Sequence, residues 1–242
     1  KSKNSDMNFR FSFFLLIVIT VSCKDAPDLF PAKFSKTPDY SWVFPDEQVK
    51  TITVNVGQEN WGKIQKDMEW RTARKFGSNT AIPGVTPPVG AALDAVYGDP
   101  IFVQAEVKQG ENTWSKVGFR LKGNASLNGS WRSGIYKLPF KLKFDEWEDQ
   151  YPDIKNQRFY GFKELSFVPS YGDDSFLREK LLTQLFRNSG VMACKVAYYK
   201  VFVDFGQVLS FVRSTLSNTQ DFERVGVGKD WILRKVRSWF VF

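Results

Sequence analysis

Residues 114–144, WSKVGFRLKGNASLNGSWRSGIYKLPFKLKF, contain the two strands and the connecting loop that decide the fold. Apolar and polar residues alternate over 114–122 and again over 137–144, and such alternation predicts strands with one buried face. The polar face of both strands is basic, and its members are Arg120, Lys122, Lys137, Lys141 and Lys143. The sequence therefore predicts two strands that carry a cationic face.

The connection between these strands, from Gly123 to Ser130, consists mostly of small residues that leave backbone amides accessible. A glycine-bearing loop of this kind can bind phosphate through its N–H groups when ammonium or guanidinium groups lie nearby. The loop lacks the Lys-Ser/Thr of a Walker A motif. An edge hairpin with lysines on its solvent side explains the same pattern, and these residues alone favour that interpretation.

The flanking segments add further strands and two helices. Residues 51–56 and 159–167 have strand patterns, whereas apolar residues three or four apart predict helices over 60–74 and 176–188. With a preceding strand and turn before residue 114, this order indicates an α+β fold. Glu179 lies at the edge of the apolar stripe of the second helix. It either reaches a strand lysine, as in kinases, or pairs with a basic neighbour on its own helix, which its spacing alone favours.

The composition excludes several classes of enzyme. The chain of 242 residues has no histidine, which rules out Ser-His-Asp and Cys-His nucleophile systems and the HExxH zinc proteases. Two cysteines cannot form a Cys-only zinc site. The chain is basic, with 34 Lys+Arg against 26 Asp+Glu, but it contains no nucleic-acid-binding motif, so we expect no nucleic-acid partner.

The N-terminal residues are predicted to be a targeting segment. After Met7, the apolar run from Phe11 to Val21 is about half as long as a membrane span, which needs ~20 residues. We expect a lipoprotein signal peptide over 1–22 with a lipid on Cys23, because the run ends in a small residue and a cysteine. An ordinary secretory signal is the alternative. The proline-rich residues 23–45 are expected to form a tether.

Four segments, taken in order, resemble the spore coat protein H (CotH) kinase-like family. They are RLKGNASL from Arg120, KLPFKLKFDE from Lys137, FYGFKELSFVPSYGDDSFLREKLLTQLFRNSGV from Phe159 and AYYKVFVD from Ala197. The resemblance is dense over residues 117–204 and thin before residue 101. Members of this family are secreted or coat-associated atypical kinases that phosphorylate serines in proteins, using ATP and a divalent metal. Their core is a reduced relative of the protein-kinase fold.

The resemblance implies a nucleotide site. The candidate residues of its phosphate loop are Arg120, Lys122, Asn124 and Ser126. Either Lys141 or Lys143 would be the phosphate-binding lysine, with Glu179 as its helix partner, and both lysines lie on the same side of their strand. The implied cofactors are ATP with Mg²⁺ or Mn²⁺, and the implied partner is an acceptor protein with serines. No metal site is visible in the sequence.

The family pattern stops near Asp204-Phe205-Gly206. This tripeptide spells the kinase metal motif, but a hairpin turn is favoured because no HRD-like loop precedes it. Beyond Gly206 the sequence does not match the family's second hairpin strand or its later catalytic aspartates. We therefore expect residues 207–242 to be a divergent tail. A disrupted reading frame is favoured over a genuine tail such as a membrane-surface helix.

The sequence thus predicts an extracytoplasmic lipoprotein, anchored in a membrane through its lipid and exposed at the cell surface. Residues 46–206 are expected to be the N-terminal part of a reduced, atypical protein-kinase-like α+β domain, an antiparallel β lobe plus a helix, incomplete at its C-terminal end. The expected activity is that of an ATP-dependent protein serine kinase that is catalytically incomplete in this chain. The alternative is a non-catalytic surface lipoprotein that binds glycan or protein.

Overall fold

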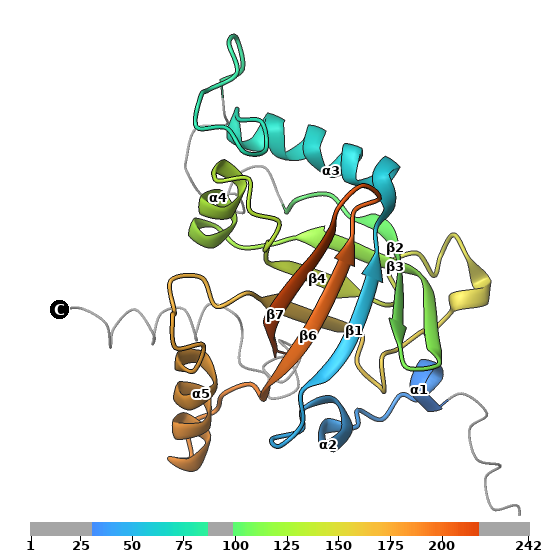
Figure 1. The fold of residues 1–242 in the computed structure, drawn as a ribbon. Coiled ribbons are helices and arrows are strands. Elements are labelled where there is room, and N and C mark those ends of the chain that lie inside the picture. The colour runs from blue at the N-terminus through green and yellow to red at the C-terminus, as the bar shows by residue number, and fades with distance from the viewer. Residues whose placement is uncertain (1–30, 87–98, 218–242) are drawn as a thin grey trace, which may run out of the picture.

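The computed structural model describes residues 31–86 and 99–217, and the segment 1–22 and Cys23 lie outside them (Figure 1). Seven strands of these residues close into a barrel in the order β1-β2-β3-β4-β5-β7-β6. The strands are β1 (Lys50–Asn55), β2 (Val103–Gln109), β3 (Asn112–Leu121), β4 (Phe140–Lys143), β5 (Glu164–Val168), β6 (Val196–Asp204) and β7 (Leu209–Ser217). β1 pairs with β6 in parallel, while the other neighbours are antiparallel, so the sheet is mixed rather than purely antiparallel.

The helices lie around the barrel, which confirms the α+β class. They are α1 (Pro31–Phe34), α2 (Tyr40–Val43), α3 (Gly57–Thr72), α4 (Ala125–Arg132) and α5 (Arg178–Asn188), with a short 3₁₀ helix η1 (Pro152–Ile154). In Figure 1, α3 lies across one end of the barrel and α2 lies beneath the other. Trp61, Ile64 and Met68 of α3 are buried, as their spacing predicted.

The predicted faces of the central strands are confirmed. Leu138, Phe140, Leu142 and Phe144 are all buried in the core cluster. The strand itself is shorter than the predicted 137–144, because Pro139 has no N–H to donate to a neighbouring strand. Leu138 nevertheless keeps its place in the core.

Part of the expected tether is packed against the barrel. Ala32, Val43 and Phe44 are buried, and the Trp42 ring stacks on Tyr160 with ring centroids 3.7 Å apart. The buried hydroxyl of Tyr199 donates to the carbonyl of Val43 at 2.8 Å. Residues 31–45 thus differ from a tether because their apolar side chains close one end of the core.

The predicted phosphate loop is mostly a helix. α4 begins at Ala125, so the irregular backbone is confined to the residues just before it. Leu127 and Trp131, four residues apart, are both fully buried, and the Trp131 Nε1–H donates to the carbonyl of Arg74 at 2.9 Å. Burial of this face stabilises a helix although small residues dominate the segment.

α5 exposes the apolar stripe that its sequence showed. None of its residues is buried, and its leucines and phenylalanine are exposed. The polar side faces the barrel instead, where Lys180 forms an ion pair with Asp46 at 3.3 Å. Leu177, the residue before the helix, makes no side-chain capping hydrogen bond, but one Asp173 carboxylate oxygen accepts from the Arg178 amide at 2.9 Å.

Asp204, Phe205 and Gly206 form the predicted hairpin turn. The Asp204 carboxylate accepts a hydrogen bond from the Gly206 amide at 2.7 Å, and Gly206 has a φ of +92°. The second hairpin strand, which the sequence did not reveal, is β7, and it pairs with both β6 and β5. The expected divergent tail therefore begins with a strand of the barrel, and residues 218–242 lie outside the described part.

Candidate nucleotide-phosphate site

Basic side chains gather on the charged face of β3, β4 and β5. Arg120 of β3 is paired in register with Lys141 of β4, and Lys141 with Ser166 of β5. Lys122 follows directly after β3 and reaches across to donate to the Ser166 hydroxyl at 3.0 Å. We call Arg120, Lys122 and Lys141 the cation cluster. Strand alternation places these side chains opposite the core residues of the same strands.

Arg120 is the most buried member of the cation cluster, with 7% of its surface exposed. One terminal nitrogen, Nη2, forms an ion pair with Asp99 at 2.6 Å, and the guanidinium lies over the Phe102 ring. The other two nitrogens, Nε and Nη1, are buried and have no hydrogen-bond partner among the described residues. A buried guanidinium with unused donors is costly, and an anion would satisfy it.

Lys122 lies in an environment that disfavours its charge. Burial is the main cause that lowers the pKa of its ammonium group, and the positive charges of Lys141 and Arg120 lower it further. The carboxylates of Glu164 and Glu179 act in the opposite direction. An added negative charge would favour the protonated form.

The two strand lysines that the sequence could not separate have different surroundings. Lys141 is largely buried and forms a 3.0 Å ion pair with Glu164 beside the rest of the cation cluster. Lys143 pairs with Glu146 at 2.7 Å, and this hydrogen bond is the main cause that raises its pKa. Lys143 is therefore already neutralised at the end of β4 by its own carboxylate.

Glu179 lies in the first turn of α5 and is half-buried. The carboxylates that pair with Lys141 and Lys143 are Glu164 and Glu146, not Glu179. Of the predicted site lysines, it is Lys122 whose pKa Glu179 raises through its charge. The structure thus associates Glu179 with the lysine that precedes α4 rather than with a lysine of β4.

Asn124 and Ser126 lie where β3 leads into α4. Asn124 precedes the first helical residue, and its carbonyl accepts from the Asn128 amide at 2.9 Å. Gly123 has a φ of +92°, and a Cβ at this position would lie 3.1 Å from the Ser126 hydroxyl oxygen. Glycine therefore allows the chain to turn tightly between the cation cluster and the helix.

Sequence reasoning missed the acidic and hydroxyl residues of this face. Glu164 and Ser166 alternate with the apolar residues Leu165 and Phe167 along β5, which was a usable signal. Ser166 lies opposite Lys141 and Glu164 opposite Lys143, and this pairing depends on strand register, which alternation within one strand does not give. Asp99 comes from a glycine- and proline-rich segment with no periodic pattern.

The described residues offer neither a metal site nor a membrane-spanning helix. They contain no group of three or more Cys, Asp or Glu side chains arranged to hold a metal ion. Within the same residues, no helix combines the length and the apolar composition that crossing a membrane requires.

Comparison with known proteins agrees with the resemblance seen in the sequence. The sequence model of the family described as CotH kinase protein matches residues 119–207. No curated protein matches the chain. The matched residues run from near the end of β3 to the β6–β7 turn and include every member of the cation cluster. The part of the chain that forms the candidate site is therefore similar to the CotH kinase proteins.

Proposed function

We propose that this protein is a kinase-like protein that binds ATP through the cation cluster, with a fold suited to act on serines of an acceptor protein, and that it is catalytically incomplete in this chain. The observation that carries the proposal is the buried Arg120 guanidinium, with two donors that lack partners among the described residues. The similarity of residues 119–207 to the CotH kinase proteins supports it. Both point to the same face of β3, β4 and β5.

The residues of the cation cluster fit the phosphates of a nucleotide. Arg120 would donate through Nε and Nη1, which lack partners among the described residues, once its side chain moves to expose these enclosed atoms. Beside an anion the pKa of Lys122 would rise back toward its ordinary value, because a negative charge opposes the burial and the like charges that lower it. ATP would supply the phosphoryl group to be transferred. In the absence of ATP, ion pairs with Asp99 and Glu164 keep the side chains of Arg120 and Lys141, respectively, oriented.

We assign Lys141, rather than Lys143, as the phosphate-binding lysine of β4. Lys141 lies beside Arg120 in register, whereas Lys143 has its own carboxylate, Glu146. Glu179 is then an electrostatic partner of Lys122. No residue of the described part is assigned to Mg²⁺ or Mn²⁺, and the aspartates for metal binding are those that the family places beyond residue 206.

The test is ATP binding by the full chain, measured by titration calorimetry. Lys122→Gln and Lys141→Gln should each weaken binding by roughly tenfold or more, because each removes a charge-assisted hydrogen bond. Lys143→Gln is the matched control on the same strand and should leave binding unchanged. Equal effects of Lys141→Gln and Lys143→Gln would contradict the assignment. Transfer from labelled ATP to a serine-rich peptide, with Mg²⁺ or Mn²⁺, tests the phosphotransferase step separately.

We also propose that the protein is an extracytoplasmic lipoprotein, held on a membrane by a lipid on Cys23. The support is the short apolar run that ends directly before this cysteine.

A second candidate function is a non-catalytic binding module for another protein. α5 and the residues on either side of it favour this function, because they expose several large apolar side chains. These are Leu177, Leu181, Leu182, Leu185, Phe186, Val191 and Met192. ATP binding that is lost in Lys122→Gln would favour the kinase-like function over this one.

A further inference from the structure

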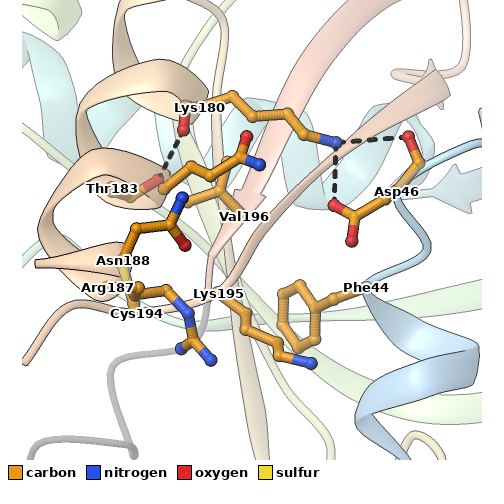
Figure 2. A pocket seen from close by; sticks show the side chains of 10 residues that line it. Phe44, Asp46, Lys180, Thr183, Arg187, Asn188, Cys194, Lys195 and Val196 are labelled. Carbon is orange, nitrogen blue, oxygen red and sulfur yellow. Dashed lines mark hydrogen bonds and ion pairs between the residues drawn. The ribbon is translucent and has the colours of Figure 1, made fainter. Parts of the chain in front are cut away.

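A polar cavity of about 260 Å³ lies between α5, the segment that leads into β6 and the segment before β1 (Figure 2). Its lining includes Lys180 and Arg187 of α5, Lys195 before β6, and Phe44 and Asp46 before β1. We call this cavity the α5 pocket. It has no residue in common with the cation cluster.

The α5 pocket has an excess of positive charge. Three cations line it, and Asp46 is the one carboxylate among its lining residues. Asp46 is engaged by Lys180, with the ammonium nitrogen 3.3 Å from a carboxylate oxygen. Among the described residues, neither Arg187 nor Lys195 forms an ion pair. Two positive charges of the lining therefore have no opposite charge paired with them in the part of the chain that the structure describes.

These two cations keep donors available for a ligand. Arg187 uses Nη1 to donate to the carbonyl of Ala193 at 3.1 Å, and Lys195 lies 5.7 Å from the Tyr40 ring centroid. Figure 2 shows both at the end of the pocket away from the Lys180–Asp46 pair, with the Phe44 ring near Lys195. The side-chain amide of Asn188 also lines the pocket. A planar guanidinium fork, an ammonium group and an amide together form a donor set for an oxyanion.

Charge and size select the class of oxyanion. A phosphate monoester carries a charge of about −1.5 to −2 near neutral pH, which matches the two unpaired cations, whereas a carboxylate carries a single charge. The volume corresponds to that of roughly nine water molecules at ~30 Å³ each. This space admits a phosphate group with a short carbon stem, and the Phe44 ring offers that stem an apolar contact.

We propose that the α5 pocket binds a phosphate monoester dianion through Arg187 and Lys195. The phosphate comes either from a phosphorylated side chain of a protein or from free phosphate. Lys180 fixes Asp46 at the other end of the pocket and keeps its carboxylate away from the anion. Cys194 lines the same cavity, so its thiol reports whether the pocket is occupied.

The experiment uses the full chain with Cys23→Ser, in which Cys194 is the single cysteine of the sequence. The probes are inorganic phosphate, a phosphoserine peptide and the same peptide with glutamate in place of phosphoserine. We expect phosphate and phosphoserine peptide to slow alkylation of Cys194 by iodoacetamide in a saturable way, with dissociation constants confirmed by calorimetry. Arg187→Gln combined with Lys195→Gln should weaken binding by roughly tenfold or more. Lys200→Gln, an exposed change on β6, is the matched control and should have no effect.

The remaining outcomes each decide the proposal. Tighter binding of the phosphoserine peptide than of phosphate would identify a phosphorylated protein as the source, and equal binding would identify free phosphate. Binding should weaken as the pH falls through about 6, where a phosphate monoester loses its second charge. Equal affinity for the glutamate peptide, unchanged binding by the double variant, or no protection of Cys194 by any probe would overturn the proposal.

Discussion

Replacing Arg120 by methionine should make the empty protein more stable and, at the same time, weaken its binding of ATP. The side chain is 7% exposed, and two of its nitrogens are buried without partners among the described residues. A buried polar group without a partner costs about 1–3 kcal/mol. Removing both of these nitrogens should therefore stabilise the fold by at least ~2 kcal/mol. Methionine occupies a similar space and is unbranched, so it can fill the same gap.

The favourable interactions that Arg120→Met removes contribute less to stability than the burial cost that it relieves. The ion pair with Asp99 involves a carboxylate that is 57% exposed, and such pairs contribute about 0–1 kcal/mol. The contact with the Phe102 ring contributes about 0.5–1 kcal/mol. The net expectation is a stabilisation of about 1 kcal/mol, which corresponds to a rise in Tm of about 2–4 °C. Binding of ATP should become roughly tenfold weaker or worse, because the lost donors are those assigned to its phosphates.

Arg158→Met is the matched control for burial. Arg158 is 6% exposed, but its Nη1 donates to the Asp145 carboxylate at 2.8 Å and to the carbonyl of Gln157 at 2.7 Å. Removing one partner of a buried pair costs about 3–5 kcal/mol, so this variant should be strongly destabilised. Urea unfolding without nucleotide, followed by titration with ATP, measures both effects. A loss of more than about 1 kcal/mol in Arg120→Met, or unchanged ATP affinity, would refute the reasoning.

Four further predictions concern single residues. Burial and like charges lower the pKa of Lys122 in the folded protein below its ordinary value of 10.5. Between the folded and the unfolded pKa the unfolded chain binds more protons, so the free energy of unfolding in urea should rise with pH in that window. Lys122→Met should remove this rise. Gly161 has a φ of +87°, and a Cβ there would overlap the carbonyl of Thr37, so Gly161→Ala should cost at least about 2 kcal/mol in urea unfolding, whereas no loss would indicate that residues 31–45 are a tether. Asp204→Ala should cost about 1 kcal/mol through the lost turn hydrogen bond and leave ATP binding unchanged, and a loss of binding would show that Asp204 belongs to the nucleotide site. Cys23→Ser should release the protein from the membrane fraction, and unchanged mass and fractionation would contradict lipidation.

The sequence predicted the elements in which one face is buried in a regular period. The alternation around Phe140 and the spacing of Trp61, Ile64 and Met68 both identified core residues correctly. It failed where small residues concealed a buried face, as in α4, where Leu127 and Trp131 outweigh the glycine and serine residues around them. Local propensity is a weak signal when burial of a large aromatic residue decides the conformation.

Long-range pairing explains most of the other differences. β7 was missed because its place in the barrel depends on pairing with both β5 and β6, which no pattern within residues 209–217 reveals. The apolar stripe of α5 was predicted from its periodicity, which marks an apolar side but does not say what covers it. In the structure the polar side of α5 faces Asp46, and the apolar side remains exposed.

In the candidate site, residue type alone could predict which residues take part, but choosing between them required their surroundings in the structure. Lys141 and Lys143 are chemically identical and share one face of β4, so the sequence could name the pair but not choose between its members. The choice comes from their neighbours, since Glu146 neutralises Lys143 while Lys141 lies beside Arg120 and raises the cost of protonating Lys122. A cluster of partly desolvated cations is unfavourable for the empty fold and favourable for an anionic ligand. The same arrangement that destabilises the fold at Arg120 and Lys122 is therefore the reason to assign phosphate binding to this face, and stability and ATP affinity should change in opposite directions when either residue is neutralised.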